Sequence, residues 1–137
     1  SRRNLLDLTK RTNTRIMENL EEVSDIIVSK KYQEVFTDEL QNIDERINLF
    51  QNANTIVCEL GAGMHNLLYC KEGTTIYVLF QKNNYSWLQE YFPLFEKKKM
   101  KVSLLFGETT NPHHNGNWLN TPWKLPISEL DKIPICS

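Results

Sequence analysis

Residues 54–69 of the chain read NTIVCELGAGMHNLLY, and this stretch determines how the remainder is arranged. A short apolar run ends at Glu59, glycines follow at positions 61 and 63, and an apolar pattern with helical spacing begins after them. We interpret the stretch as a buried strand, a tight glycine turn and the start of a helix. A turn without Cβ atoms lets a ligand approach the main chain, and free N–H groups at a helix start favour an anion such as phosphate. A tight connection without a ligand is the competing interpretation, because a lone Gly-x-Gly pair is weak evidence.

Helical and strand-like patterns alternate along the rest of the chain. Apolar spacings and caps predict helices over residues 14–29, 38–50, 86–93 and 126–132. β-branched and aromatic runs predict strands over residues 32–37, 56–59, 74–80 and 102–106. This alternation predicts an α/β fold with a mostly parallel sheet, right-handed crossovers and helices on both faces, which is a three-layer sandwich.

Single residues mark the predicted ends of these elements. Asp38 and Ser86 are the expected N-caps of their helices. Pro93 is expected to end the helix that Ser86 begins, because proline disrupts a helix interior. Gly73 suits the left-handed position that follows a helix, between the glycine turn and the next strand.

No strand is predicted ahead of the first helix, although a helix that opens a βα unit normally follows one. We therefore expect residues 1–137 to be a single domain that is a fragment, or the C-terminal half, of a larger two-domain protein. At 40% hydrophobic and 24% charged residues, the chain has the composition of a globular domain with a proper core.

Composition also argues against several classes of partner and ligand. A net charge of −1 gives no field that would attract nucleic acid, and no apolar run approaches the ~20 residues that span a bilayer. The cysteines, Cys58, Cys70 and Cys136, are odd in number and lack metal-ligand spacing, which favours a reducing, cytoplasmic compartment. No Asp-x-Asp is present to hold a metal against a diphosphate, so we expect no metal in this part of the protein.

The glycine turn resembles a motif of the Rossmann-like methyltransferases. In that family, a strand followed by Glu-x-Gly-x-Gly-x-Gly holds S-adenosylmethionine, and residues 59–63 are similar to the start of this motif. The third glycine of the motif would fall at His65 and is absent. The following strand should end in an acidic residue that binds the ribose hydroxyls, but Gln81 stands there.

The sequence more closely resembles glycosyltransferase family 61, which includes plant xylosyltransferases and a protein O-mannose N-acetylglucosaminyltransferase. Family members carry His-Gly-Ala-Gly-Leu-x-Asn-Leu-Leu-Phe, a glycine turn and a strand. Residues 61–69 (GAGMHNLLY), Gly73 and residues 75–79 (TIYVL) follow this pattern. The resemblance continues upstream in residues 1–3, 15–19 and 46–53, and covers about residues 1–106.

This resemblance implies an enzyme of the GT-B type, built from two Rossmann-like halves, that transfers a sugar from a nucleotide sugar to a glycan or protein-linked acceptor. The chain would be the C-terminal, donor-binding half, with the nucleotide sugar as substrate and no other cofactor. An N-terminal half or a partner chain would supply the general base. The cysteines favour a cytoplasmic location, whereas the family resemblance implies the lumen of the endoplasmic reticulum or Golgi as an alternative.

The resemblance also assigns roles to individual residues. Main-chain N–H groups of the glycine turn would face the donor diphosphate, and arginine side chains would neutralise its charge. The residues assigned in this way to the donor site are Glu59, Gly61, Ala62, Gly63, Met64, His65, Asn66, Arg2, Arg3 and Arg15. Asn66 would anchor the loop or touch the ligand. Glu59 would accept bonds from sugar hydroxyls or fix the loop.

Several alternatives stay open at this point. The family histidine before Gly-Ala-Gly is Leu60 here, and His65 either substitutes for it or is a capping or surface histidine. A domain that keeps the fold but has lost the chemistry is the corresponding functional alternative. His113, His114 and Trp118 lie in the long loop of residues 108–122, which is either an acceptor-binding loop or a plain surface loop.

Overall fold

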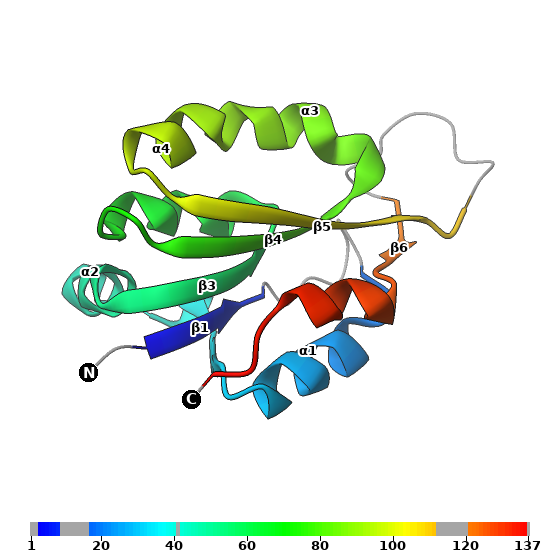
Figure 1. The fold of residues 1–137 in the computed structure, drawn as a ribbon, viewed down its shortest axis with the longest axis horizontal. Helices are drawn as coiled ribbons and strands as arrows, with labels where there is room; N and C mark the ends of the chain where they lie inside the picture. The colour runs from blue at the N-terminus through cyan, green and yellow to red at the C-terminus, as the bar shows by residue number, and fades with distance from the viewer. Residues whose placement is uncertain (1–2, 9–16, 41, 112–120, 137) are drawn as a thin grey trace.

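A six-stranded sheet with helices on both faces forms the body of the protein (Figure 1). The computed structural model describes residues 3–8, 17–40, 42–111 and 121–136. The strands are β1 (Arg3–Asp7), β2 (Gln33–Val35), β3 (Ala53–Glu59), β4 (Thr75–Gln81), β5 (Lys101–Thr109) and β6 (Trp123–Lys124). The α-helices are α1 (Leu20–Ser29), α2 (Ile43–Gln51), α3 (Tyr85–Leu88) and α4 (Phe92–Lys97). The 3-10 helices are η1 (Thr37–Glu39), η2 (Ala62–Tyr69), η3 (Lys82–Asn84), η4 (Gln89–Tyr91) and η6 (Ile127–Lys132).

The strands lie in the order β2-β1-β3-β4-β5-β6. Neighbours from β2 to β5 pair in parallel, whereas Glu108 and Thr109 of β5 pair antiparallel with β6. The sheet is therefore mixed, which corrects the expectation of a mostly parallel sheet. The sequence did not indicate β6, because a two-residue strand between Pro122 and Pro126 is too short to show any alternation.

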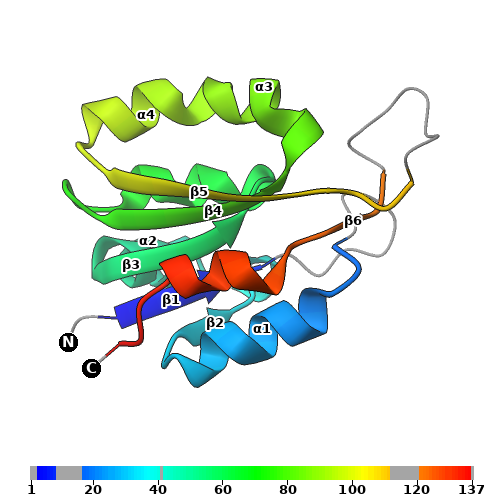
Figure 2. The same cartoon turned by 45° about the vertical axis from the view of Figure 1, so that its right-hand side comes forward.

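Two separate hydrophobic cores fill the space between the sheet and its helices. On one face, strand residues such as Ile56 and Ile76 pack against α2, η2 and the helical segment from α3 to α4. On the other face, strand residues such as Val57 and Leu79 pack against α1 and η6. Figure 2 shows α3 and α4 on one side of the sheet, and α1 with η6 on the other. The predicted helix coverage of both faces is thus confirmed.

β1 is a second strand that the sequence did not indicate. It lies in the interior of the sheet between β2 and β3, and both Leu5 and Leu6 are fully buried. Its apolar run is only a pair of leucines next to Asn4 and Asp7, so periodicity alone did not reveal it. The expectation that the first strand is missing is wrong, and the inference of a fragment from that missing strand loses its basis.

Several predicted helix ends are also corrected. Asn42, not Asp38, caps α2: its side chain accepts a hydrogen bond from the Asp44 N–H at 2.8 Å. Pro93 lies in the first turn of α4, where its missing N–H costs no helical hydrogen bond, so the chain stays helical beyond it. Ser86 lies inside α3 rather than at its cap.

The left-handed glycine after the turn is confirmed, since Gly73 has a φ of 83°. A second glycine, Gly107 in β5, is required for a different reason. A Cβ built at Gly107 would overlap the carbonyl oxygen of Lys124 and would lie 3.1 Å from the Cα of Leu125. The absence of a side chain at position 107 therefore lets the segment around β6 approach β5.

Substituting Gly107→Ala should destabilise the protein by about 1–3 kcal/mol, because the added methyl group meets main-chain atoms that cannot rotate away. Denaturant unfolding measures this loss. Ser103→Ala, an exposed site on the same strand, is the control and should change stability by less than about 0.5 kcal/mol. Equal stability of Gly107→Ala and the wild type would contradict the close approach.

Candidate functional site

The carboxyl ends of β1 and β3 meet at the point where the strand order reverses. The chain runs from β1 outward to β2, then crosses to β3 and continues toward β5 in the opposite direction. In open α/β sheets, ligands bind in the crevice outside the strand ends at such a reversal. Asp7 ends β1 and Glu59 ends β3, both largely buried, and the glycine turn directly follows Glu59. The predicted turn therefore lies at the position where a ligand is expected.

The main chain bends sharply immediately after β3. The Leu60 N–H still donates to the Leu79 carbonyl at 2.9 Å, which extends the pairing with β4. The Gly61 carbonyl then accepts from the Met64 N–H at 3.0 Å and begins η2. Gly61 is extended, with φ 168°, a value open to any residue, so its conformation does not by itself require glycine. As at any helix start, the first N–H groups of η2 have no acceptor within the helix itself.

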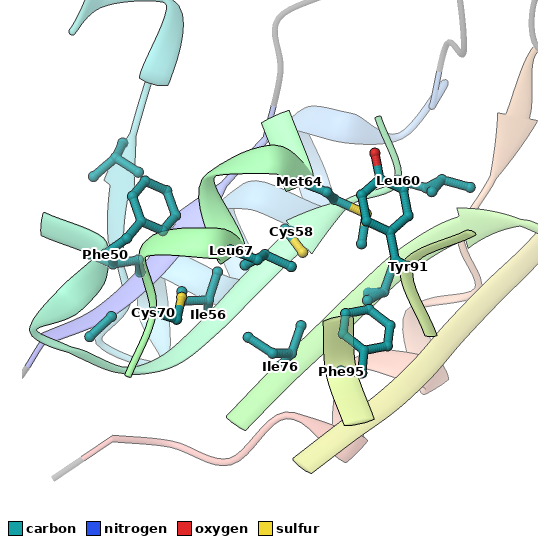
Figure 3. Close-up of a cluster of buried hydrophobic side chains, with 14 of the residues drawn as sticks. Phe50, Ile56, Cys58, Leu60, Met64, Leu67, Cys70, Ile76, Tyr91 and Phe95 are labelled. Carbon is teal, nitrogen blue, oxygen red and sulfur yellow. The ribbon is translucent and has the colours of Figure 1, made fainter. Parts of the chain in front are cut away.

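The side chains of η2 divide between the core and the surface. Met64 and Leu67 point into the hydrophobic cluster beneath the turn (Figure 3). His65 is exposed, and Gly63 is half-buried. Asn66 is 7% exposed, and its Nδ2 donates to the Gly63 carbonyl at 3.0 Å. Asn66 therefore anchors the turn, which is one of the two roles that the family resemblance offered for it.

Tyr91 contributes to this site from outside the glycine-turn motif. It belongs to η4 and is 8% exposed, and its hydroxyl donates to the Gly61 carbonyl at 3.4 Å. Its ring lies beside the His65 ring, with the centroids 5.9 Å apart. The aromatic residue at helical spacing indicated burial correctly, but nothing in the sequence indicated a contact across 30 positions.

The described residues place none of the arginines assigned to the donor site at the glycine turn. Arg3 begins β1 and pairs with Ala53 at the start of β3, so its main chain lies at the sheet edge opposite the glycine turn. That edge is separated from the turn by the length of β3, or ~20 Å at ~3.3 Å per residue. Arg2 and Arg15 lie outside the described residues, as do His113, His114 and Trp118 and the side chain of Ala62.

Asp7 and Gln81 end two other strands of the sheet, and both side chains make hydrogen bonds within the protein. Asp7 accepts a hydrogen bond from the Thr37 hydroxyl at 3.5 Å, and both side chains are buried. β4 ends at Gln81, whose side chain accepts from the Asn83 N–H at 2.9 Å. No acidic residue closes that strand, so no observation favours the S-adenosylmethionine interpretation.

The central cysteine is not suited to nucleophilic chemistry. Burial, followed by the neighbouring Asp7, Cys70 and Glu59, raises the pKa of the Cys58 thiol well above its usual value. A raised pKa keeps the sulfur in its neutral thiol form as the pH rises, and only the thiolate is a good nucleophile. Cys58 is therefore a core residue beneath the turn (Figure 3).

Other surface features lie away from the turn. A groove of about 590 Å³ runs between the end of β5, η6 and the start of α1, and none of the residues assigned to the donor lines it. No cluster of three or more histidine, cysteine or carboxylate side chains in the described part of the chain is arranged to hold a metal ion. Within the same residues, no helix combines the length and apolar character that crossing a bilayer requires.

Comparison with known protein families identifies the family of the matched segment. Residues 1–77, more than half of the chain, match the family model described as Glycosyltransferase 61. The matched range contains β1, β3 and the entire glycine turn. Comparison with curated proteins gives no significant match.

Timed alkylation of the folded chain with iodoacetamide at pH 8 should modify Cys136, which is half-buried, well before Cys58. Mass spectrometry of the digested protein identifies the modified residue, and urea-unfolded protein, in which all the cysteines react, is the control. Labelling of Cys58 in the folded state as fast as Cys136 would contradict a buried, protonated thiol.

Proposed function

The chain belongs to the glycosyltransferase 61 family, and from that premise we propose that its glycine turn binds the diphosphate of a nucleotide sugar whose sugar is transferred to a glycan or protein-linked acceptor. The observation that carries the proposal is the position of the turn. The family match includes it, and it lies beside the reversal of strand order. A family motif and a ligand-binding position of the fold thus coincide in the same residues.

The main chain of the turn has the chemistry that a diphosphate needs. N–H groups at the start of η2 point away from the helix and carry the positive end of its dipole, which favours an anion. Such donors stabilise the negative charge that develops on the departing nucleoside diphosphate, and this stabilisation speeds transfer of the sugar. Asn66 supports them indirectly, because its bond to the Gly63 carbonyl keeps the turn in one conformation.

The imidazole near the donor would come from a different position than in the family motif. Leu60, which stands where family members carry histidine, is 3% exposed and belongs to the core, so its side chain serves packing. His65 is exposed on the turn itself, and we assign it the place of the family histidine in this site. Arg3 is not part of the proposed site because its backbone lies at the opposite edge. Arg15 remains a candidate for charge neutralisation.

The proposal extends to the organisation of the enzyme. We assign the chain the role of the donor-binding half of a two-half, GT-B type glycosyltransferase, in which a further half supplies the acceptor site and the general base. The support is the resemblance of the turn motif to family 61, together with an α/β fold that offers a ligand position at its strand ends. The nucleotide sugar is then the substrate, and no resident cofactor is part of the proposal.

Isothermal calorimetry with uridine, guanosine and cytidine diphosphates tests the proposal. At least one should bind the wild-type chain, and Asn66→Ala should weaken that binding by about 10-fold, because the turn loses its side-chain anchor. The matched control is Asn52→Ala. It also removes a side-chain bond to a carbonyl, that of Asn48, but before β3 at the opposite edge. This variant should bind like the wild type. Failure of all three diphosphates to bind would contradict the proposal.

A further inference from the structure

Two side-chain donors hold the carbonyl groups of the glycine turn toward the protein. Asn66 bonds the Gly63 carbonyl from within the same short helix. The Tyr91 hydroxyl bonds the Gly61 carbonyl from η4, a segment that follows the next strand of the sheet. The turn is therefore held from within η2 by Asn66 and by the Met64 N–H, which donates to the same Gly61 carbonyl at 3.0 Å, and from a distant helical segment by Tyr91.

We propose that Tyr91 is a positioning residue for the donor diphosphate, whose hydroxyl orients the peptide between Gly61 and Ala62 so that its N–H faces the phosphate. The peptide unit is planar and trans, so its C=O and N–H point in opposite directions. A hydrogen bond that holds the Gly61 oxygen against the protein consequently aims the Ala62 N–H outward. This inference rests on the proposed function, since it concerns the same turn.

The ring of Tyr91 also contacts the His65 side chain. It lies 5.9 Å from the His65 ring, at an interplanar angle of 57°, and so limits the positions open to that exposed imidazole. One side chain thereby restrains both a main-chain donor and the histidine beside it.

The surroundings of Tyr91 suit this role. It packs in the same cluster as Met64 and Phe95, which keeps the ring in place beneath the turn (Figure 3). Burial, followed by the nearby Glu90 and Cys58, raises the pKa of its hydroxyl, so the group remains a protonated donor at neutral pH. A buried tyrosine hydroxyl needs a hydrogen-bond partner, and here that partner is the main chain of the turn.

Tyr91→Phe in the full chain tests the inference, because phenylalanine keeps the ring and removes only the hydroxyl. The first readout needs no ligand. In amide NMR spectra, the signals of Ala62 and Gly63 should shift, whereas Tyr85→Phe, which alters an exposed tyrosine of α3, should leave them in place. The second readout is calorimetry with uridine, guanosine and cytidine diphosphates. The diphosphate that binds the wild type should bind Tyr91→Phe about 3- to 10-fold more weakly.

Thermal unfolding accompanies both readouts, and binding is compared at a temperature at which all variants are folded. Unshifted Ala62 and Gly63 signals, or wild-type affinity in Tyr91→Phe, would overturn the positioning role. If the wild-type chain binds none of the diphosphates, the proposed function fails. The amide signals then still decide whether Tyr91 orients the turn.

Discussion

The bend between β3 and η2 is the constraint on which the rest of the structure depends. Within a few residues, the chain completes its pairing with β4 through Leu60 and begins a helix through the Gly61 carbonyl. The carbonyls of Gly61 and Gly63 are both held by side-chain donors, Tyr91 and Asn66. The N–H groups at the start of η2 are consequently the main-chain groups of the bend that we propose bind a ligand.

The fold supports this bend from below and from the side. Met64 and Leu67 anchor η2 in the core formed with β3 and β4, so the turn cannot lift away without exposing buried apolar surface. The helical segment from η3 to α4 crosses the same face and brings Tyr91 to the turn. Because Pro93 lies in the first turn of α4, this segment remains helical and Tyr91 keeps its place. The residues that pack the core thus also fix the geometry of the proposed site.

The sequence predicted the features that depend on local pattern. Apolar runs and glycines within each segment were enough to predict β3, β4, the turn and the left-handed Gly73. These features do not depend on which segments lie beside them in the fold. β1 was missed because its burial comes from β2 and β3 on either side, while its own apolar run is only Leu5 and Leu6. β6 exists through its contact with β5 and has no pattern of its own.

The same distinction holds at the site. The glycine turn was predicted directly after a buried strand, because the motif and that strand are contiguous in the chain, and the strand order then places the turn at the reversal. Tyr91 lies outside the motif, and its spacing within a predicted helix indicates burial but not which carbonyl its hydroxyl reaches. Arg3 was assigned to the donor site through the resemblance of residues 1–3 to the family, whereas it begins β1 at the far edge.

The central claim is that the main chain of residues 61–66 holds a diphosphate, and an amide NMR titration tests it most directly. Uridine diphosphate is added to the isotope-labelled chain, and uridine alone is added in parallel. The account predicts that the diphosphate moves the amide signals of residues 61–66 more than any others, and that uridine leaves those signals nearly unmoved. Shifts gathered in the groove between β5 and η6, with residues 61–66 unaffected, would contradict it.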